Sequence, residues 1–362
     1  MKRILKIFIS ICIVAGIFNL CQLLIQKARV NDVEVSEDTN MGEVSLKKNT
    51  ILIQKKNTIL NFPFIFGERL YLYDIDKDRE YLIADCVRPF HSFGDMLAVC
   101  NNTVYYNIFR DGPGIEVYSK GVNEVSKGKK ILDQAGLYLV SSKDIYYLKI
   151  KETTYKEEQN FLYKKDLESG KTGIVLKENL SDVLRMDHGH IYSWNRFSKE
   201  LLEIGEDTHS VTRYPTEESP LWIGYVDGHR FLSIDEGNVI LYDKNTRKKH
   251  YLVKDIKKES ELLTEKAKYE NGYLYYNNQN LDFYRLDVYS GKNKKICSLS
   301  GIDKVKEYNK YKEYYADVNY CKDYITIDLS YAINHHLGIM KRRLLVFDYK
   351  GNLIKVQKLA AL

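Results

Sequence analysis

Hydrophobic and polar residues alternate along this chain in short runs, and turn-forming residues separate the runs. The stretch ENGYLYYNNQNLDFYRLDVYSGKNKKI (270–296) shows the pattern: a turn pair and a strand, then a strand, a turn and another strand. Gly, Asn and Asp tolerate the positive φ that tight hairpins need, and alternation places one face of each strand on a core. The pattern therefore predicts antiparallel hairpins.

This phrase recurs along the chain. Its first half resembles CNNTVYY (100–106), SKDIYYLKI (142–150), DHGHIYSW (187–194), VDGHRFLS (226–233) and CKDYITIDL (321–329). Its second half recurs as hairpins that begin at residues 70, 115, 161, 201, 239, 283 and 344, about 40 to 60 residues apart. A repeat of about 40–50 residues with four strands is typical of a β-propeller.

The predicted fold class is all-β, with a single propeller over residues 50–362. Seven outer hairpins favour seven blades, and residues 50–66 can supply the inner strands of the first blade. That segment resembles the repeat least, so six blades is the alternative. Helical patterns are sparse; residues 254–269 and 303–315 are the two plausible short helices.

The N-terminus has a different pattern. Lys2, Arg3 and Lys6 precede an apolar run from Ile7 to about Ile25. A run of about 18 or more apolar residues can span a bilayer as a helix, and basic residues before it favour a cytoplasmic N-terminus. We expect a transmembrane signal anchor over residues 1–29, a flexible tether over 30–49, and an extracytoplasmic C-terminal domain. A cleaved signal peptide, a lipoprotein signal and a cytosolic propeller are the alternatives.

Blade geometry predicts the binding face. The first-to-second and third-to-fourth strand turns of each blade are tight and share one face, whereas the longer connections share the other. Long loops on a rigid scaffold are where function concentrates. We therefore predict ligand-binding residues on the longer connections: Arg110, Tyr155, Arg196, His335, His336, Arg342 and Arg343.

Catalytic and metal signatures are weak. His188 and His190 flank Gly189 at a predicted turn, without further residues at metal-ligand spacing. Asp74, Asp76 and Asp78 alternate like a calcium loop, but its glycine and final glutamate are missing, so a hairpin turn explains them better. No catalytic residue, metal or cofactor is predicted.

Charge and cysteines narrow the picture further. The formal net charge of +6 comes from 55 basic and 49 acidic residues without a concentrated basic face, so no nucleic-acid partner is expected. Cys86, Cys100, Cys297 and Cys321 fall on strands too far apart within a blade for disulfides, and we expect reduced, mostly buried thiols.

The pieces NGYLYY…FYRLDVYSGK and KDIYYLK…LYKKDLESGK resemble repeats of bacterial surface propellers. Those domains are similar to the six-bladed propellers of low-density-lipoprotein-receptor-related proteins or to TolB-like propellers. The resemblance covers roughly residues 65–360, and the chain lacks the Tyr-Trp-Thr-Asp tetrapeptide of the receptor propellers. It implies a secreted or anchored binding module and carries over no catalytic residues.

The sequence thus favours a membrane-anchored, extracytoplasmic propeller that binds a protein or a glycan at the cell surface or serves as a scaffold there. The membrane would be a partner through the N-terminal helix. The alternative is a propeller enzyme, such as a lyase, a hydrolase or a quinone-dependent dehydrogenase, with its site at the channel mouth.

Overall fold

The computed structural model describes residues 49–359, except for segments 57–67, 87–91, 101, 110–114, 123, 125–127, 150–160, 179, 196, 217–218, 236, 255, 257–261, 303–313 and 335–338. Within these residues the backbone forms antiparallel strands in six hydrogen-bonded sheets. The single helical element among them is the short 3-10 turn η3 (Leu299–Gly301).

Each sheet is built from strands that follow one another in the sequence. The first sheet consists of β1 (Thr50–Lys56), β2 (Glu68–Asp74) and β3 (Arg79–Cys86). The second has seven strands, β4 (Ser92–Cys100), β5 (Thr103–Phe109), β6 (Ile115–Gly121), β7 (Lys129–Val140), β8 (Asp144–Lys149), β9 (Leu162–Asp166) and β10 (Thr172–Leu176).

Four sheets of four strands complete the fold. The third sheet consists of β11 (Ser181–Asp187), β12 (His190–Asn195), β13 (Glu200–Gly205) and β14 (Val211–Pro215), and the fourth of β15 (Trp222–Asp227), β16 (Arg230–Ile234), β17 (Val239–Asp243) and β18 (Lys248–Val253). The fifth sheet consists of β19 (Leu263–Glu270), β20 (Tyr273–Asn278), β21 (Asp282–Asp287) and β22 (Asn293–Ser298), and the sixth of β23 (Tyr314–Tyr320), β24 (Tyr324–Asn334), β25 (Ile339–Asp348) and β26 (Leu353–Leu359).

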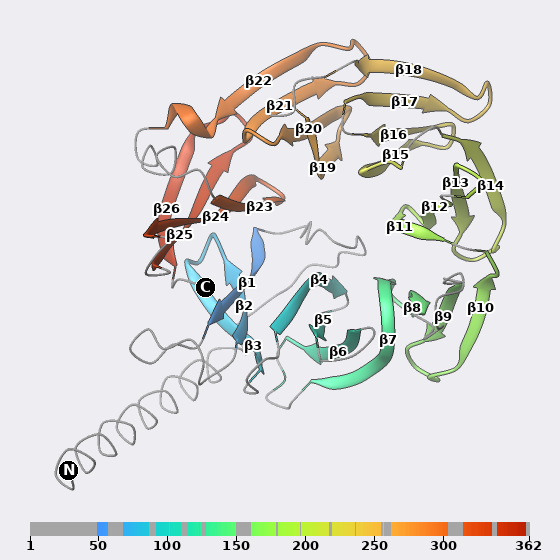
Figure 1. Ribbon diagram of the computed structural model, residues 1–362, viewed down its shortest axis with the longest axis horizontal. Helices are drawn as coiled ribbons and strands as arrows, with labels where there is room; N and C mark the ends of the chain where they lie inside the picture. The colour runs from blue at the N-terminus through green and yellow to red at the C-terminus, as the bar shows by residue number, and fades with distance from the viewer. Residues whose placement is uncertain are drawn as a thin grey trace, which may run out of the picture.

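The sheets stand around a common centre, with β11, β15, β19 and β23 on the inside and β14, β18, β22 and β26 on the outside (Figure 1). Apolar side chains fill the junctions between neighbouring sheets, as where Phe283 meets Phe347 at 6.5 Å between ring centroids. Ile51 of the first sheet shares a buried cluster with Val346 of the last, so the ring is closed. This arrangement confirms the predicted all-β propeller-type fold.

The predicted hairpin turns are present. Gly189 and Gly272 have φ of 74° and 84°, a region that residues with a Cβ rarely adopt. A backbone hydrogen bond recurs beside these turns: Glu206 N–H donates to Gly189 O at 2.9 Å, and Val288 N–H to Gly272 O at 3.0 Å. It ties the two tight turns of one sheet together on the same face.

Strand β7 belongs to two sets of strands at once. Its first part pairs with β6 as far as Ala135, and its second part pairs with β8 from the same Ala135 onward. Because both parts are hydrogen-bonded, β4–β7 and β7–β10 form one continuous seven-stranded sheet. The strand curves strongly where it changes partner (Figure 1).

Two sequence predictions are wrong in part. The second half of the helix expected at 254–269 is not helical, because Leu263–Glu270 is strand β19. Asn49, assigned to the flexible tether, is buried, and its Nδ2 donates to Asp76 Oδ2 at 2.9 Å and to Asp323 Oδ2 at 3.0 Å. The side chain thereby joins a turn of the first sheet to a turn of the last.

Other predictions are confirmed or lie outside the described residues. Cys100, Cys297 and Cys321 are free thiols, and the first and last are buried. The expected signal anchor, the tether before Asn49 and most of the helix expected at 303–315 lie outside the described residues. No helix among the described residues is long and apolar enough to cross a membrane.

Candidate functional site

Most of the predicted binding residues lie outside the part of the chain that the structure describes: Arg110, Tyr155, Arg196, His335 and His336. For these, the sequence-based prediction stands as a prediction. Arg342 and Arg343 are described, and they lie in strand β25 instead of a loop. The predicted loop over 330–343 is largely made by the ends of β24 and β25.

Arg342 is buried between strands instead of lying exposed on the surface. Its side chain is buried, its Nε donates to Asp328 Oδ1 at 2.7 Å, and its Nη2 pairs with Asp328 Oδ2. Its Nη1 donates to the carbonyl oxygen of Gln54 in β1. Arg342 therefore links the last sheet to the first, and it is a buried strand residue instead of the exposed loop residue that was expected. Arg343 is half-buried.

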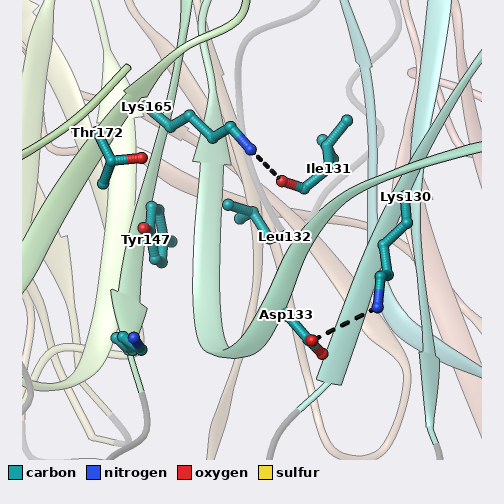
Figure 2. Close-up of a pocket in the computed structure, with 8 residues that line it drawn as sticks. Lys130, Ile131, Leu132, Asp133, Tyr147, Lys165 and Thr172 are labelled. Carbon is teal, nitrogen blue, oxygen red and sulfur yellow. Dashed lines mark hydrogen bonds and ion pairs between the residues drawn. The ribbon is translucent and has the colours of Figure 1, made fainter. Parts of the chain in front are cut away.

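A pocket of about 250 Å³ lies where β7 curves away from β6 toward β8. Its wall is formed by Lys130, Ile131, Leu132, Asp133, Tyr147, Lys149, Lys165 and Thr172, which come from β7, β8, β9 and β10 (Figure 2). It lies beside the part of β7 where the pairing passes from β6 to β8. The end of β8 is where the longer connection to β9 begins.

The cross-strand register explains why three of these side chains share one face. Tyr147 pairs with Tyr163, and Lys165, two residues further along β9, pairs with Thr172. Residues opposite each other, and residues two apart, point to the same face of a sheet. The rings of Tyr147 and Tyr163 also stack, with centroids 5.5 Å apart.

Lysine side chains dominate the polar wall. Lys165 Nζ donates to Ile131 O at 2.6 Å, which fixes the ammonium between β9 and β7 (Figure 2). Lys130 Nζ lies 3.1 Å from Glu116 Oε1 and 3.4 Å from Asp133 Oδ2. The hydrogen bond with Glu116 raises the pKa of Lys130, so this residue stays charged. Lys149 has no ion-pair partner among the described residues.

The hydroxyl groups add donors and acceptors. Burial raises the pKa of Tyr147, and a hydrogen bond with Thr172 opposes that rise. A phenol with a raised pKa is neutral at physiological pH and both donates and accepts. The pocket thus offers ammonium donors, two hydroxyls and the Asp133 carboxylate, a set suited to binding a small polar group.

No protein-family model matches the chain, and no curated protein matches it in sequence. Among solved structures it is similar to the computationally designed protein Ika8, with 10% identity over 90% of this chain and 91% of that one, at a TM-score of 0.50. It is also similar to the uncharacterized protein lmo1340 from Listeria monocytogenes EGD-e, with 10% identity, 73% and 80% coverage and a TM-score of 0.49. A third similar structure is BamB from Moraxella catarrhalis, with 9% identity over 73% of this chain and 87% of that one, at a TM-score of 0.44.

These likenesses concern the fold alone. The match to Ika8 extends over about nine-tenths of both chains. The resemblance of the repeats to receptor-related or TolB-like propellers is not accompanied by a family-level match.

A second polar cluster lies at the junction between β11–β14 and β15–β18. His188 and His190 flank the predicted turn, and both rings stack on Tyr225, with centroid distances of 4.5 and 6.1 Å. Asp187 Oδ1 lies 2.6 Å from His188 Nδ1, and its Oδ2 accepts the N–H of Tyr225 at 2.8 Å. The turn was visible in the sequence, whereas the packing on Tyr225 depends on the neighbouring repeat.

The buried carboxylate of Glu203 organises the same junction. It accepts hydrogen bonds from Tyr192 at 3.2 Å, Tyr214 at 2.5 Å and Lys244 at 2.5 Å, and its Oε1 lies 3.2 Å from His190 Nδ1. The two histidines therefore face different carboxylates. Among the described residues, no three His, Cys, Asp or Glu side chains are placed to hold a metal ion.

We expect the substitution Asp187→Asn to lower the pKa of His188. The hydrogen bond to Asp187 raises this pKa, while desolvation opposes it. Because the folded-state pKa is raised, His188 contributes stability that is fully present below about pH 6.5 and is lost as pH rises through the folded pKa. NMR titration of the imidazole measures the shift, and Asp207→Asn, an exposed turn carboxylate, is the control. An unchanged pKa in Asp187→Asn would contradict this assignment.

Proposed function

We propose that this chain is a membrane-anchored, extracytoplasmic β-propeller that binds a protein or glycan partner at the cell surface. The observation that carries the proposal is the polar pocket at the β7 bend, built on strands of a closed ring. Rigid strands hold the backbone of the wall in place, so little backbone conformational entropy is lost when a ligand binds.

We also infer that the ring has seven blades. The backbone hydrogen bond from Ile75 N–H to Asn49 O, at 2.8 Å, matches the bonds to Gly189 and Gly272, which supports β1 as the second strand of its blade. The partner change in β7 supports two blades joined in one sheet. One blade in the three-stranded sheet, two in the seven-stranded sheet and one in each of the four remaining sheets give seven blades, the number that the repeats predict.

The anchor rests on the sequence. Lys2, Arg3 and Lys6 precede the apolar run that begins at Ile7, and together they favour a helix that leaves the propeller outside the membrane. We propose that the connections with Arg110 and Tyr155 extend the binding surface beyond the pocket. The connections with Arg196, His335 and His336 would lie further around the same face.

The test is a pull-down from intact cells after treatment with a membrane-impermeant cross-linker. Lys149 is exposed at the last position of β8, so Lys149→Glu should reduce capture of the partner by about tenfold, as expected when one charged hydrogen-bonding group is lost. Lys143→Glu makes the same charge change in the turn at the opposite end of β8 and should leave capture unchanged.

Two outcomes would contradict the proposal. Cross-linking that requires permeabilised cells would place the propeller on the cytoplasmic side of the membrane. Equal capture by the Lys149→Glu and Lys143→Glu variants would remove the pocket from the binding surface. Thermal unfolding of both variants checks that each remains folded.

A further inference from the structure

We propose that the pocket at the β7 bend binds one carboxylated sugar residue of an acidic polysaccharide. This inference rests on the proposed function and names the ligand class for the same site. It follows from the size of the pocket, the balance of its charges and the mixture of its hydrogen-bonding groups.

The size limits the ligand to one small unit. Sites for drug-sized molecules span about 300–1,000 Å³. The pocket at the β7 bend has a volume of about 250 Å³, is lined by β7 on one side and by β8, β9 and β10 on the other, and opens to solvent. A single ring with its substituents fits this description, while the rest of a polymer would extend into solvent.

The charges of the pocket wall favour a carboxylate on the bound sugar. Lys130, Lys149 and Lys165 line the pocket against one carboxylate, Asp133. Glu116 and Asp133 both lie near Lys130, so the positive charge of Lys130 is largely neutralised. Lys149 and Lys165 are the cations left to face a ligand. Lys165 is held by Ile131 O at 2.6 Å, and an ammonium has three N–H donors, so donors remain for an anion.

The remaining groups favour a sugar over a bare inorganic anion. Phosphate or sulfate offers mainly acceptors and would meet the Asp133 carboxylate unfavourably. Sugar hydroxyls donate as well as accept, so they can bond to Asp133 and to the hydroxyls of Thr172 and Tyr147. An acidic peptide would satisfy the lysines but would leave Asp133 without a donor from its carboxylate side chains.

The experiment uses the full-length protein in detergent, titrated by calorimetry at low ionic strength. The probes are trigalacturonate, the same trisaccharide with its carboxylates methyl-esterified, a triglutamate peptide and sodium sulfate. The ester keeps the hydroxyls and removes the charge. We expect trigalacturonate to bind about tenfold or more tightly than the ester, because the ester loses a hydrogen bond between charged groups.

Variants locate the binding. Lys149→Gln should weaken trigalacturonate binding by about tenfold. The control Lys143→Gln, in the β7–β8 turn outside the pocket, should leave it unchanged. Asp133→Ala should weaken the trisaccharide but strengthen sulfate, since it removes both an acceptor for hydroxyls and a repelling charge. A site for inorganic anions would respond to Asp133→Ala only with stronger binding.

Several results would overturn the inference. Equal binding of the acid and the ester would remove the carboxylate from recognition, and tighter binding of triglutamate would indicate an acidic peptide. Equal affinities of Lys149→Gln and Lys143→Gln would place the ligand elsewhere. If the intact-cell cross-linking still depends on Lys149 while trigalacturonate fails to bind, the binding module stands and only its assigned ligand class is wrong.

Discussion

Arg342→Ala should destabilise the protein by about 3–5 kcal/mol, the usual cost of removing one partner of a buried ion pair. Arg342 is 6% exposed and is the donor to both carboxylate oxygens of Asp328. Alanine would leave that carboxylate buried without its cation, and Gln54 O would lose its donor. Because Gln54 belongs to β1 and Arg342 to β25, the loss falls on the contact that closes the ring.

Urea unfolding followed by circular dichroism measures the effect. Arg343→Ala is the matched control, since it removes the same side chain from the next position of β25, where the residue is half-buried. We expect Arg343→Ala to lower the free energy of unfolding clearly less than Arg342→Ala does. Replacing both members of the pair, Arg342→Met with Asp328→Leu, should recover much of the stability, because apolar residues of similar size often replace buried ion pairs at little cost.

The loss of stability caused by Arg342→Ala should also depend on pH. Burial raises the pKa of Asp328 above its usual value, and Arg342 opposes the rise. Without Arg342 the pKa rises further, so the variant loses stability as pH increases from the unfolded-state value to the folded one. The gap between the Arg342→Ala variant and the unmodified protein should therefore narrow on acidification. A constant gap, or an equal loss in Arg343→Ala, would contradict the ring-closing role.

Local patterns determined what could be predicted from the sequence. The turn Asn271–Gly272 has φ of 51° and 84°, as the pair Asn-Gly before a Tyr-rich strand indicated. Each hairpin is set by residues close together in the chain, and the repeat of hairpins indicates a ring. The fold class follows from signals of this short range.

Arg342 shows what the sequence could not provide. Lys341, Arg342 and Arg343 are consecutive charged residues, a pattern typical of solvent-exposed segments. Burial of Arg342 depends on Asp328, which lies across the β24–β25 pairing, and on Gln54 at the other end of the domain. Nothing in the local sequence indicates the contact with Gln54.

The pocket also depends on contacts between residues that are far apart in the sequence. The sequence predicts a hairpin that begins at residue 115, but the change of the hydrogen-bonding partner of β7 at Ala135 depends on where β6 ends and β8 begins. The pocket wall then combines side chains from four strands. The residues lack a motif because each one has an ordinary role in its own strand.

Phe231→Ala should also cost about 3–5 kcal/mol, the range for truncating a buried phenylalanine. Phe231 is 0% exposed in β16, with Tyr242 of the same sheet stacked at 4.9 Å. Tyr214 at 5.2 Å and Tyr192 at 6.1 Å belong to the neighbouring sheet β11–β14. The ring thus fills the junction between two sheets.

Truncation at this junction would leave a cavity that the sheets have difficulty closing, because the strands on both sides are fixed by hydrogen bonds to their own neighbours. Phe197→Ala is the control: Phe197 is 61% exposed, and its truncation should change stability by less than about 0.5 kcal/mol. Urea unfolding compares the two variants, and the near-ultraviolet circular dichroism of the tyrosines reports on the junction. If Phe231→Ala unfolded at the same urea concentration as Phe197→Ala, the sheets would not depend on aromatic packing between them. Cohesion of the ring would then have to come from polar contacts such as those of Asn49 and Arg342.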